Sequence, residues 1–413
     1  MARPQGFIPE DLGYLGIKPL GSVNVKYEYE TINRGNGRFP LQPLPSMDAI
    51  RPIYYNSPMT LYDKLFFPAF KQIDAETAHD RTLTALEKAQ TNPVGQSVLR
   101  RIAGVLPQQP VTVFGLTFPN VLGIAAGFDK DVRVAAGLGM LGFGHIEVGT
   151  LTPWPQPGNP KPRVFRLPED EAIINRMGFP NGGVVRALPR LRALAVGERP
   201  FILGVSLGKQ KQTPLAEADK DYLLVMHAVY AYADYLAINI SSPNTPGLRE
   251  LQGGNYLGQL LGALVAENGR LAQKHAIAPR PLLVKIAPDV SWSELDEILT
   301  AVQAAGIDGL IATNTTLSRD GLQSGLREEA GGLSGRPLAT RSTEIIAYIA
   351  RQTGGRLPII GVGGVQTAVD AQAKLDAGAS LVQLYTGLVY GGPGIAGTIL
   401  RQLAADSQTT NPE

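Results

Sequence analysis

Eight short, nearly continuous apolar runs recur along the chain from residue 122 onward, and most are separated by segments with helical spacing and a capping residue. Runs that are apolar at nearly every position are typical of parallel strands buried on both faces. Eight such strands alternating with helices is the count of a (β/α)8 TIM barrel, an α/β fold. The predicted strands are Leu122–Phe128, His145–Thr150, Phe201–Leu207, Tyr235–Ser241, Leu282–Ala287, Gly309–Thr315, Pro358–Gly363 and Leu381–Thr386.

A doubly wound open sheet is the main alternative, since it has the same alternation of strands and helices. Against it, no G-x-G-x-x-G motif follows the first predicted strand. The gaps after the second, fourth and sixth strands are long, and such gaps usually hold functional loops or a small inserted subdomain. The run VTVFGLTF, which begins at Val111, predicts a short β-hairpin just before the barrel.

Residues 1–56 carry a different pattern from the barrel, which is expected to span residues 106–405. They hold seven Pro and six Gly with little periodicity, which predicts an irregular arm. They show no charged start followed by an apolar stretch, so a secretory signal is not expected. No segment of the chain reaches the ~18 apolar residues needed to cross a bilayer, so no transmembrane helix is expected.

Residues 57–105 are expected to form a cap of short helices. Apolar residues recur near helical spacing from Leu61 to Ile73 and cover a wide face of the first helix. Asp74 is a candidate N-cap for a second helix that ends near residue 90. A third helix is expected over residues 96–103.

Composition excludes several kinds of chemistry. The chain has 413 residues and no Cys, so disulfides, thiolate nucleophiles, iron–sulfur clusters and Cys-ligated zinc are excluded within it. No two of the four His are spaced i, i+3 or i+4, so no metal site is expected. Lys and Arg number 38 against 36 Asp and Glu, with no basic block, which argues against nucleic acid as a partner.

The carboxyl ends of the predicted strands carry many Lys, Asn, Ser and Thr residues, and Asp129 is the exceptional carboxylate. In a TIM barrel these ends build the active site. Such a ring suits an anionic ligand that offers several carbonyl and N–H groups. It does not suit a glycosidase, which needs two opposed carboxylates, or a magnesium site. The ring comprises Ala125–Lys130, Thr150, Ser206, Asn239–Asn244, Lys285, Thr313–Thr315, Gly363, Gly364 and Tyr385–Gly387.

Glycine-bearing turns follow the last two predicted strands, at Gly361–Gly364 and Tyr385–Gly387. Loops after strands seven and eight of a barrel commonly hold a phosphate on backbone N–H groups at a helix N-terminus. The simpler interpretation is that the glycines close tight turns. Because such a turn follows each of the two strands, a phosphate site is the favoured interpretation.

Lys285 is expected to be buried and to point inward, between Val284 and Ile286. A buried lysine forms a Schiff base or pairs with an anion, and a carboxylate partner in the core is the less common situation for an inward lysine. The run SSPNTPGLRELQGGN after the fourth strand is long and polar, which predicts a mobile lid that carries catalytic groups.

Three functions remain open from the residues alone. The first is an enzyme with a phosphate-bearing cofactor, with flavin mononucleotide (FMN) favoured because the ring has room for an isoalloxazine. The second is an aldolase with Lys285 as the Schiff-base former. The third is an inert barrel that serves as a binding scaffold.

The motifs, taken together, resemble class 2 dihydroorotate dehydrogenase, the quinone-linked family of pyrimidine synthesis. The resemblance extends from about Thr60 to the last helix and leaves out the arm. Nine motifs occur in the order of the family: AAGFDK, EVGTLTPWPQPGNPKPRVFRL, INRMGF, INISSPNTPGL, VKIAPD, IATNTT, GGLSGRPL, PIIGVGG and GASLVQLYTG.

The resemblance implies an FMN-containing barrel that oxidises dihydroorotate to orotate and passes electrons to ubiquinone or menaquinone. Ser242 resembles the base that removes the C5 proton. The residues that resemble the orotate-binding set are Lys130, Asn175, Arg176, Met177, Gly178, Phe179, Asn239, Asn244, Asn314 and Thr315. Those that resemble the FMN site are Ala126, Gly127, Phe128, Asp129, Lys130, Thr150, Ser206, Asn239, Lys285, Thr313, Gly335, Gly364, Tyr385 and Thr386.

The quinone-linked branch also implies a helical cap, which residues 57–105 match. His79, Arg166 and Tyr385 resemble residues of its quinone tunnel. Class 1 relatives have Cys where this chain has Ser242, and the absence of Cys also rules out an iron–sulfur cluster in this chain; no iron–sulfur partner subunit is expected. The implied location is peripheral, on the cytoplasmic side of a bacterial membrane, with the first helices lying in the interface.

One departure from the family pattern falls on the third strand. The family usually has Asn in a motif resembling GVNLGKNK, and here the run is GVSLGKQK with Ser206 at that place. A serine cannot offer both a donor and an acceptor at amide reach. Either a water molecule fills the space left by the shorter side chain, or the protein binds FMN and orotate more weakly.

Overall fold

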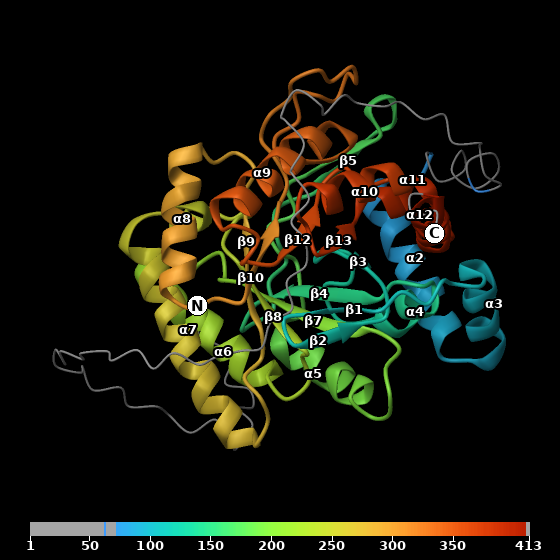
Figure 1. Cartoon of the computed structure of the whole chain (residues 1–413). Helices are drawn as coiled ribbons and strands as arrows, with labels where there is room; N and C mark the ends of the chain where they lie inside the picture. Colours follow the sequence, from blue (N-terminus) through green and yellow to red (C-terminus); the bar gives the residue numbers. More distant parts are fainter. Residues whose placement is uncertain (1–61, 63–71, 410–413) are drawn as a thin grey trace. The chain divides into compact units, whose positions relative to one another are not determined.

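A computed structural model of the chain describes Tyr62 and residues 72–409. Eight parallel strands close into a barrel in the order β10–β12–β13–β3–β4–β7–β8–β9 (Figure 1). Because the sheet is closed, the TIM-barrel prediction is confirmed and the open-sheet alternative is excluded. The strands are β3 (Leu122–Ile124), β4 (His145–Leu151), β7 (Ile202–Leu207), β8 (Tyr235–Asn239), β9 (Leu282–Ile286), β10 (Gly309–Ala312), β12 (Ile359–Val362) and β13 (Leu381–Leu384).

Helices follow the strands and surround the barrel (Figure 1). Two of them begin with a capping box, Ser291 with Glu294 in α8 and Thr367 with Asp370 in α10, so side chains satisfy their first N–H groups. The helices are α4 (Ala135–Met140), α5 (Gly183–Leu194), α6 (Ala218–Val229), α7 (Gly254–His275), α8 (Trp292–Ala304), α9 (Ala339–Gln352), α10 (Ala368–Asp376), α11 (Thr386–Gly391) and α12 (Ile395–Thr409).

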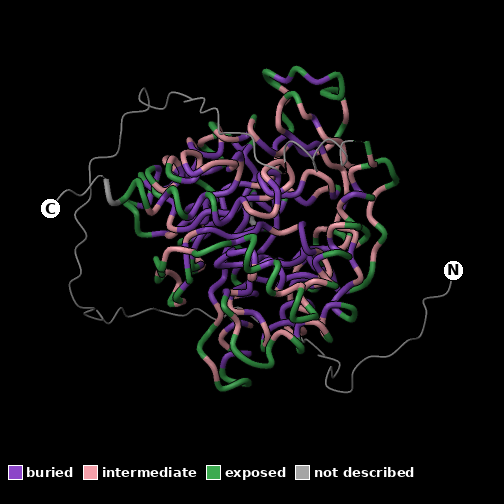
Figure 2. The backbone as a smooth tube through the Cα atoms, turned by 90° about the vertical axis from the view of Figure 1, so that its right-hand side faces the viewer, coloured by how far each residue is buried: buried purple, intermediate pink, exposed green. Residues whose placement is uncertain are grey.

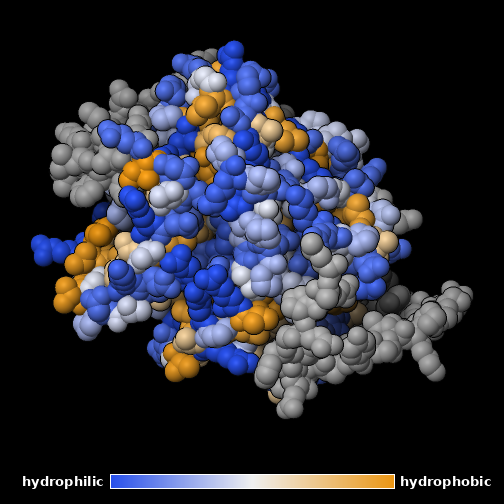
Figure 3. Space-filling model, turned by 180° about the vertical axis from the view of Figure 1, so that it is seen from behind, coloured by the Kyte–Doolittle hydropathy of each residue, from blue (hydrophilic) through white to orange (hydrophobic). Residues whose placement is uncertain are grey.

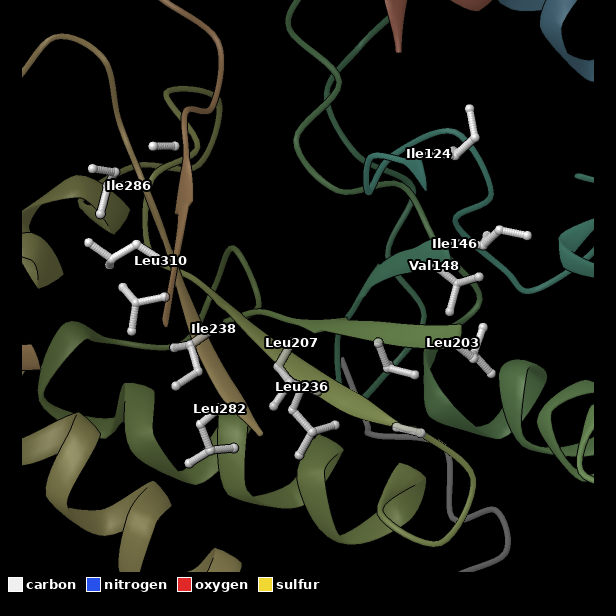
Figure 4. Close-up of a cluster of buried hydrophobic side chains, with 14 of the residues drawn as sticks. Ile124, Ile146, Val148, Leu203, Leu207, Leu236, Ile238, Leu282, Ile286 and Leu310 are labelled. Carbon is white, nitrogen blue, oxygen red and sulfur yellow. The ribbon is translucent and has the colours of Figure 1, made fainter. Parts of the chain in front are cut away.

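Alternation along the strands separates two buried clusters. On β8, Leu236 and Ile238 belong to the larger cluster, which includes the inner faces of the helices. Figure 4 shows these side chains pointing from the strands towards the helices beneath them. Tyr235 and Ala237 belong to a second cluster inside the barrel. The strands, which are buried at the centre of Figure 2, therefore have both faces covered, as is typical of parallel sheets.

Three long connections carry additional structure, as the gap lengths predicted. The gaps after β4 and β10 supply a separate antiparallel sheet of β5 (Val164–Leu167), β6 (Ala172–Asn175) and β11 (Gly332–Gly335). The loop after β8 contains a 3-10 turn, η5 (Leu248–Gln252). The predicted hairpin is formed by β1 (Val111–Val113) and β2 (Leu116–Phe118), and its Phe118 packs into the barrel interior.

Two helices of the expected cap lie within the described residues. Helix α2 (Ala75–Gln90) begins at the predicted cap, where Asp74 accepts a hydrogen bond of 2.9 Å from the Thr77 backbone N–H. Helix α3 (Pro93–Ala103) begins earlier than predicted, because Asn92 caps it and Pro93 occupies the first position.

The rest of the expected cap lies outside the described residues. The arm and the first expected helix fall there, apart from Tyr62 and residues 72 and 73. Within the described part of the chain, helices long and apolar enough to cross a membrane are absent.

A glycine on β7 gives a test of packing inside the barrel. A Cβ on Gly204 would lie 2.1 Å from Cζ of Tyr235, so Gly204→Ala is expected to lower the free energy of unfolding by about 1–3 kcal/mol. Gly258 on the exposed face of α7 has no atom within 4 Å of such a Cβ, so Gly258→Ala is expected to raise it by about 0.5–1 kcal/mol. Denaturant titrations of both variants measure the two changes, and equal effects would contradict the packing argument.

Candidate active site

A cavity lies at the carboxyl ends of the barrel strands, where the sequence places the chemistry. Its wall also includes residues from β6, from the loop after β8 and from β11, so all three long connections contribute to it. Predicted residues that line it are Ala126, Gly127, Lys130, Thr150, Asn175, Met177, Gly178, Phe179, Asn239, Ser242, Asn244, Lys285, Thr313, Asn314, Thr315, Gly335, Gly364, Tyr385 and Thr386.

Four of the residues predicted for the orotate and FMN sites do not line this cavity. Asp129 instead caps the turn before α4, where its two carboxylate oxygens accept backbone hydrogen bonds from Arg133 at 2.6 Å and Val134 at 2.7 Å. Phe128 lines a second cavity. Arg176 points to Glu329, with 2.6 Å between its Nη1 and the carboxylate.

Ser206, the departure from the family pattern, lies behind the cavity wall rather than in it. It is fully buried, and its hydroxyl is 2.9 Å from the Thr150 hydroxyl. The Asn239 amide donates to the same Thr150 oxygen over 2.8 Å. In this structure Ser206 therefore supports Thr150 from behind, and Thr150 itself lines the cavity.

Asparagine amides on neighbouring strand ends fix one another's orientation. The Asn314 amide nitrogen donates to the Ser241 hydroxyl over 2.9 Å, and its oxygen accepts from the Thr315 backbone over 2.8 Å. The Asn244 amide nitrogen donates to the Asn175 oxygen over 3.0 Å, which links the loop after β8 to β6. Such a wall presents donors and acceptors in set directions.

The loop that carries Ser242 is tied down by Arg249, which the sequence reasoning missed. The Arg249 guanidinium donates to the Ser241 carbonyl over 3.1 Å and to the Thr315 carbonyl over 3.0 Å, and pairs with Asp289 at 2.7 Å. Its only sequence signal is a charge within an otherwise Gly- and Pro-rich loop. The predicted mobility of this loop stays a prediction.

Two lysines reach the cavity from different depths. Lys130 donates to the Gly127 carbonyl, and burial lowers the pKa of Lys130 to about 8. Lys285 lies on the inward face of β9, and its Nζ is 3.8 Å from Oε1 of Glu147. The expectation of a lysine without a carboxylate partner was wrong, because Glu147 occupies an inward position within an apolar run.

Ser334 and Leu338 also line the cavity, although the sequence reasoning did not select them. The Ser334 hydroxyl accepts a 2.8 Å hydrogen bond from the Thr386 hydroxyl, which joins β11 to the start of α11. Both residues fall within the motif GGLSGRPL, which was the available signal.

A second cavity of about 980 Å3 lies between α2, α3 and the barrel, and its lining is mostly apolar. The predicted tunnel residues His79, Arg166 and Tyr385 all line it. The ring centroids of His79 and Phe128 are 5.0 Å apart, and those of Phe128 and Tyr385 are 5.9 Å apart. Burial lowers the pKa of His79 to about 3, so its imidazole is neutral near pH 7.

The two cavities share a wall. Asn175, Met177 and Tyr385 line both of them. The Tyr385 hydroxyl also lies 3.4 Å from the Gly127 carbonyl, so this ring is held at the edge of the polar cavity. A cavity lined by amides, hydroxyls and two lysines, called the polar cavity below, therefore adjoins a mostly apolar cavity through a single layer of residues.

Comparison with known proteins defines the family. The family model described as dihydroorotate dehydrogenase matches residues 109–406, so the chain belongs to that family. A protein of Acidithiobacillus ferrooxidans named dihydroorotate dehydrogenase (quinone) is 50% identical over 342 residues, which are 82% of this chain and 93% of that protein. One of the same name from Methylococcus capsulatus is 48% identical over 351 residues, 84% and 99% of the two chains.

Solved structures agree with this assignment. A crystal structure of an Eimeria tenella dihydroorotate dehydrogenase in complex with ferulenol has a TM-score of 0.74 and 38% sequence identity, and covers 82% of this chain and 92% of that one. Membership of the family excludes the aldolase and the inert scaffold that the residues alone left open.

Proposed function

We propose that this protein oxidises dihydroorotate to orotate with FMN as its bound cofactor and a membrane quinone, ubiquinone or menaquinone, as the electron acceptor. Membership of the family supports the overall reaction, a step of pyrimidine biosynthesis. The observation that carries the proposal is the wall shared by two cavities, one lined by amides, hydroxyls and lysines and the other mostly apolar. One suits a polar substrate with its cofactor, and the other suits a lipophilic acceptor.

The residues around the polar cavity fit FMN. Gly335 and Gly364 have positive φ angles of 101° and 74°, and a Cβ on Gly364 would lie 2.4 Å from Cβ of Ala339. These turns therefore require glycine, and glycine-bearing turns of this kind can present backbone N–H groups to a phosphate. Thr386 begins α11, whose first N–H groups lack intrahelical partners. When bound, FMN accepts a hydride from the substrate and passes the electrons to the acceptor.

The substrate would bind through a cation and a set of amides. The Lys130 ammonium neutralises the substrate carboxylate, and the amides match the donors and acceptors of its imide edge. The proposed set is Lys130, Asn175, Asn239, Asn244, Asn314 and Thr315, all of which line the polar cavity. Met177, Gly178 and Phe179 close the cavity from the loop after β6.

Ser242 is the proposed base that removes the C5 proton. Serine is a weak base at its ordinary pKa and needs support. The Ser242 hydroxyl oxygen accepts a 3.3 Å hydrogen bond from the Asn244 backbone N–H, which favours the form with more negative charge on oxygen. Its side chain is buried, so bulk water competes little for that oxygen.

The quinone would enter the apolar cavity beside His79 and Arg166 and approach the cofactor along Tyr385. Helix α3 supports peripheral attachment to a membrane, the cytoplasmic side of a bacterial membrane in our proposal. Val94, Val98 and Ile102 lie on one side of α3 with exposed fractions of 75, 51 and 37%. Figure 3 shows apolar residues gathered at its left edge, on the side of α3. Such a stripe suits the acyl boundary of a bilayer.

A spectrum of the purified protein is the experiment that tests the function. Flavin absorbance that is bleached by dihydroorotate in the absence of oxygen, and not by NADH, is the expected result. Colour should return on addition of a quinone. A colourless protein, or one bleached by NADH, would contradict the proposal.

The first prediction here concerns the base. Ser242→Ala is expected to slow flavin reduction by dihydroorotate by about 10²- to 10⁴-fold, because only the reductive half-reaction needs a base. Stopped-flow absorbance measures both halves, and re-oxidation by quinone should be unchanged. Ser241→Ala is the matched control. The Ser241 hydroxyl accepts a hydrogen bond from the Asn314 amide and is not the proposed base, so its loss should slow flavin reduction far less. Equal slowing of both halves would count against Ser242.

The second concerns pH. The pKa of Lys130 is about 8, so its charge is present below that pH and is lost as pH rises through it. The KM for dihydroorotate is therefore expected to rise up to about tenfold per unit above pH 8. In Lys130→Arg the guanidinium keeps its charge, so the rise should vanish. Steady-state measurements of the KM against pH for the parent protein and Lys130→Arg test this. If the KM of Lys130→Arg still rises above pH 8, the titration belongs to another group.

The third concerns the membrane. The double variant Val94→Glu/Val98→Glu is expected to bind lipid vesicles about tenfold more weakly or worse, because it places two charges on the apolar stripe. Co-sedimentation with vesicles of mixed anionic and neutral lipids measures the bound fraction. Val185→Glu, at a valine 55% exposed on α5, is the control and should bind like the parent. Undiminished binding by the double variant would contradict the assignment of α3.

A further inference from the structure

A buried polar cluster lies inside the barrel beneath the proposed flavin site. Glu147 on β4 is fully buried, and one of its oxygens, Oε2, accepts from the Tyr235 hydroxyl at 3.1 Å and from the Gln383 amide at 3.2 Å. The amide and the hydroxyl are themselves 3.3 Å apart. Residues on β4, β8 and β13 therefore hold one carboxylate at the centre of the barrel.

The sequence builds this cluster by alternation and by a missing side chain. Glu147 lies between Ile146 and Val148, which point outward, so Glu147 points inward. Gly204 is the partner of Glu147 in the register of β4 and β7, and of Tyr235 in that of β7 and β8. Because Gly204 has no side chain, the Tyr235 ring crosses that space and reaches Glu147.

The other oxygen of Glu147 faces a cation. Oε1 is buried and has no hydrogen-bond partner among the residues that the structure describes. It lies 3.8 Å from Nζ of Lys285, whose side chain is 5% exposed. Lys285 lines the polar cavity and Glu147 does not, so the carboxylate lies behind the ammonium. A buried carboxylate that loses its cation is strongly destabilised, so each charge depends on the other.

We propose that Glu147 is a positioning residue: it holds the Lys285 ammonium at the floor of the flavin site and offsets part of its charge. Lys285 favours the reduced flavin, which carries more negative charge than the oxidised form. Glu147 acts against that preference through the same few ångströms of low-dielectric interior. The balance of the two charges sets how easily the flavin is reduced and how readily it returns electrons to a quinone. The inference rests on FMN as the cofactor.

The flavin midpoint potential measures this balance without an activity assay. Glu147→Gln keeps the shape of the side chain and removes its charge. The equilibrium between oxidised and reduced flavin is expected to shift at least tenfold towards the reduced form. For a two-electron couple a tenfold shift is about 30 mV, here in the positive direction. An unchanged or lower potential in the folded, flavin-loaded variant would overturn the proposal.

His145→Gln is the matched control. His145 lies two residues earlier on the same inward face of β4 and is also fully buried. Burial lowers the pKa of His145 to about 3, so the substitution removes no charge near pH 7. It is expected to leave the potential unchanged. A shift equal to that of Glu147→Gln would show a general effect of repacking the interior and would overturn the proposal.

Three further variants keep the test decisive if Glu147→Gln alone fails to fold. Glu147→Asp keeps the charge and withdraws it by one methylene, so the potential should rise by less than with Gln. Lys285→Met should lower the melting temperature, and Glu147→Gln/Lys285→Met should restore part of it, because the single variant strands a buried carboxylate. A double variant no more stable than Lys285→Met would overturn the pairing. A parent protein without flavin would instead contradict the proposed function.

Discussion

The alternation of inward and outward side chains along the eight parallel strands of a closed barrel is the constraint on which the rest of the structure depends. Each strand is buried on both faces, so outward residues such as Leu236 and Ile238 pack under helices and cannot take part in chemistry. Among the strand residues, the inward positions near the carboxyl ends, such as Asn239 and Lys285, remain to form a site together with the loops that follow the strands. Closure of the sheet then brings these residues together from strands far apart in sequence.

This constraint explains how much could be predicted from the sequence. The strands follow from nearly continuous apolar runs, and the burial of Lys285 follows from its apolar neighbours; both are local signals. The family motifs supplied the residues around the cavity. Glu147 was missed because the run HIEVGT was counted as an apolar strand, although the same alternation places its acid inward. Its meeting with Lys285 depends on barrel register, which single strands do not encode.

The other differences have similar causes. Helix α3 begins at Pro93 and not at the predicted residue 96, because the Asn92 side chain caps it. Asp129 follows a strand end, as the other site residues do, but its carboxylate accepts hydrogen bonds from two backbone N–H groups of the next turn and does not line the cavity. Arg249 gave no periodic signal, since its partners lie on loops that follow other strands. In each case a hydrogen bond to a distant or adjacent backbone decided the outcome.

Oxidation of a polar substrate by a lipophilic acceptor requires that electrons cross a boundary that neither reactant can cross. Here the boundary is one layer of residues, in which Tyr385, Met177 and Asn175 face both cavities. On the apolar side, the His79 ring packs edge-on against Phe128 and is neutral near pH 7, so its burial in the apolar wall does not require a charge to be desolvated. On the polar side, the buried acid behind Lys285 limits how tightly the site would hold the electrons. A site that favoured the reduced state without limit would complete the first half of the reaction and stall in the second.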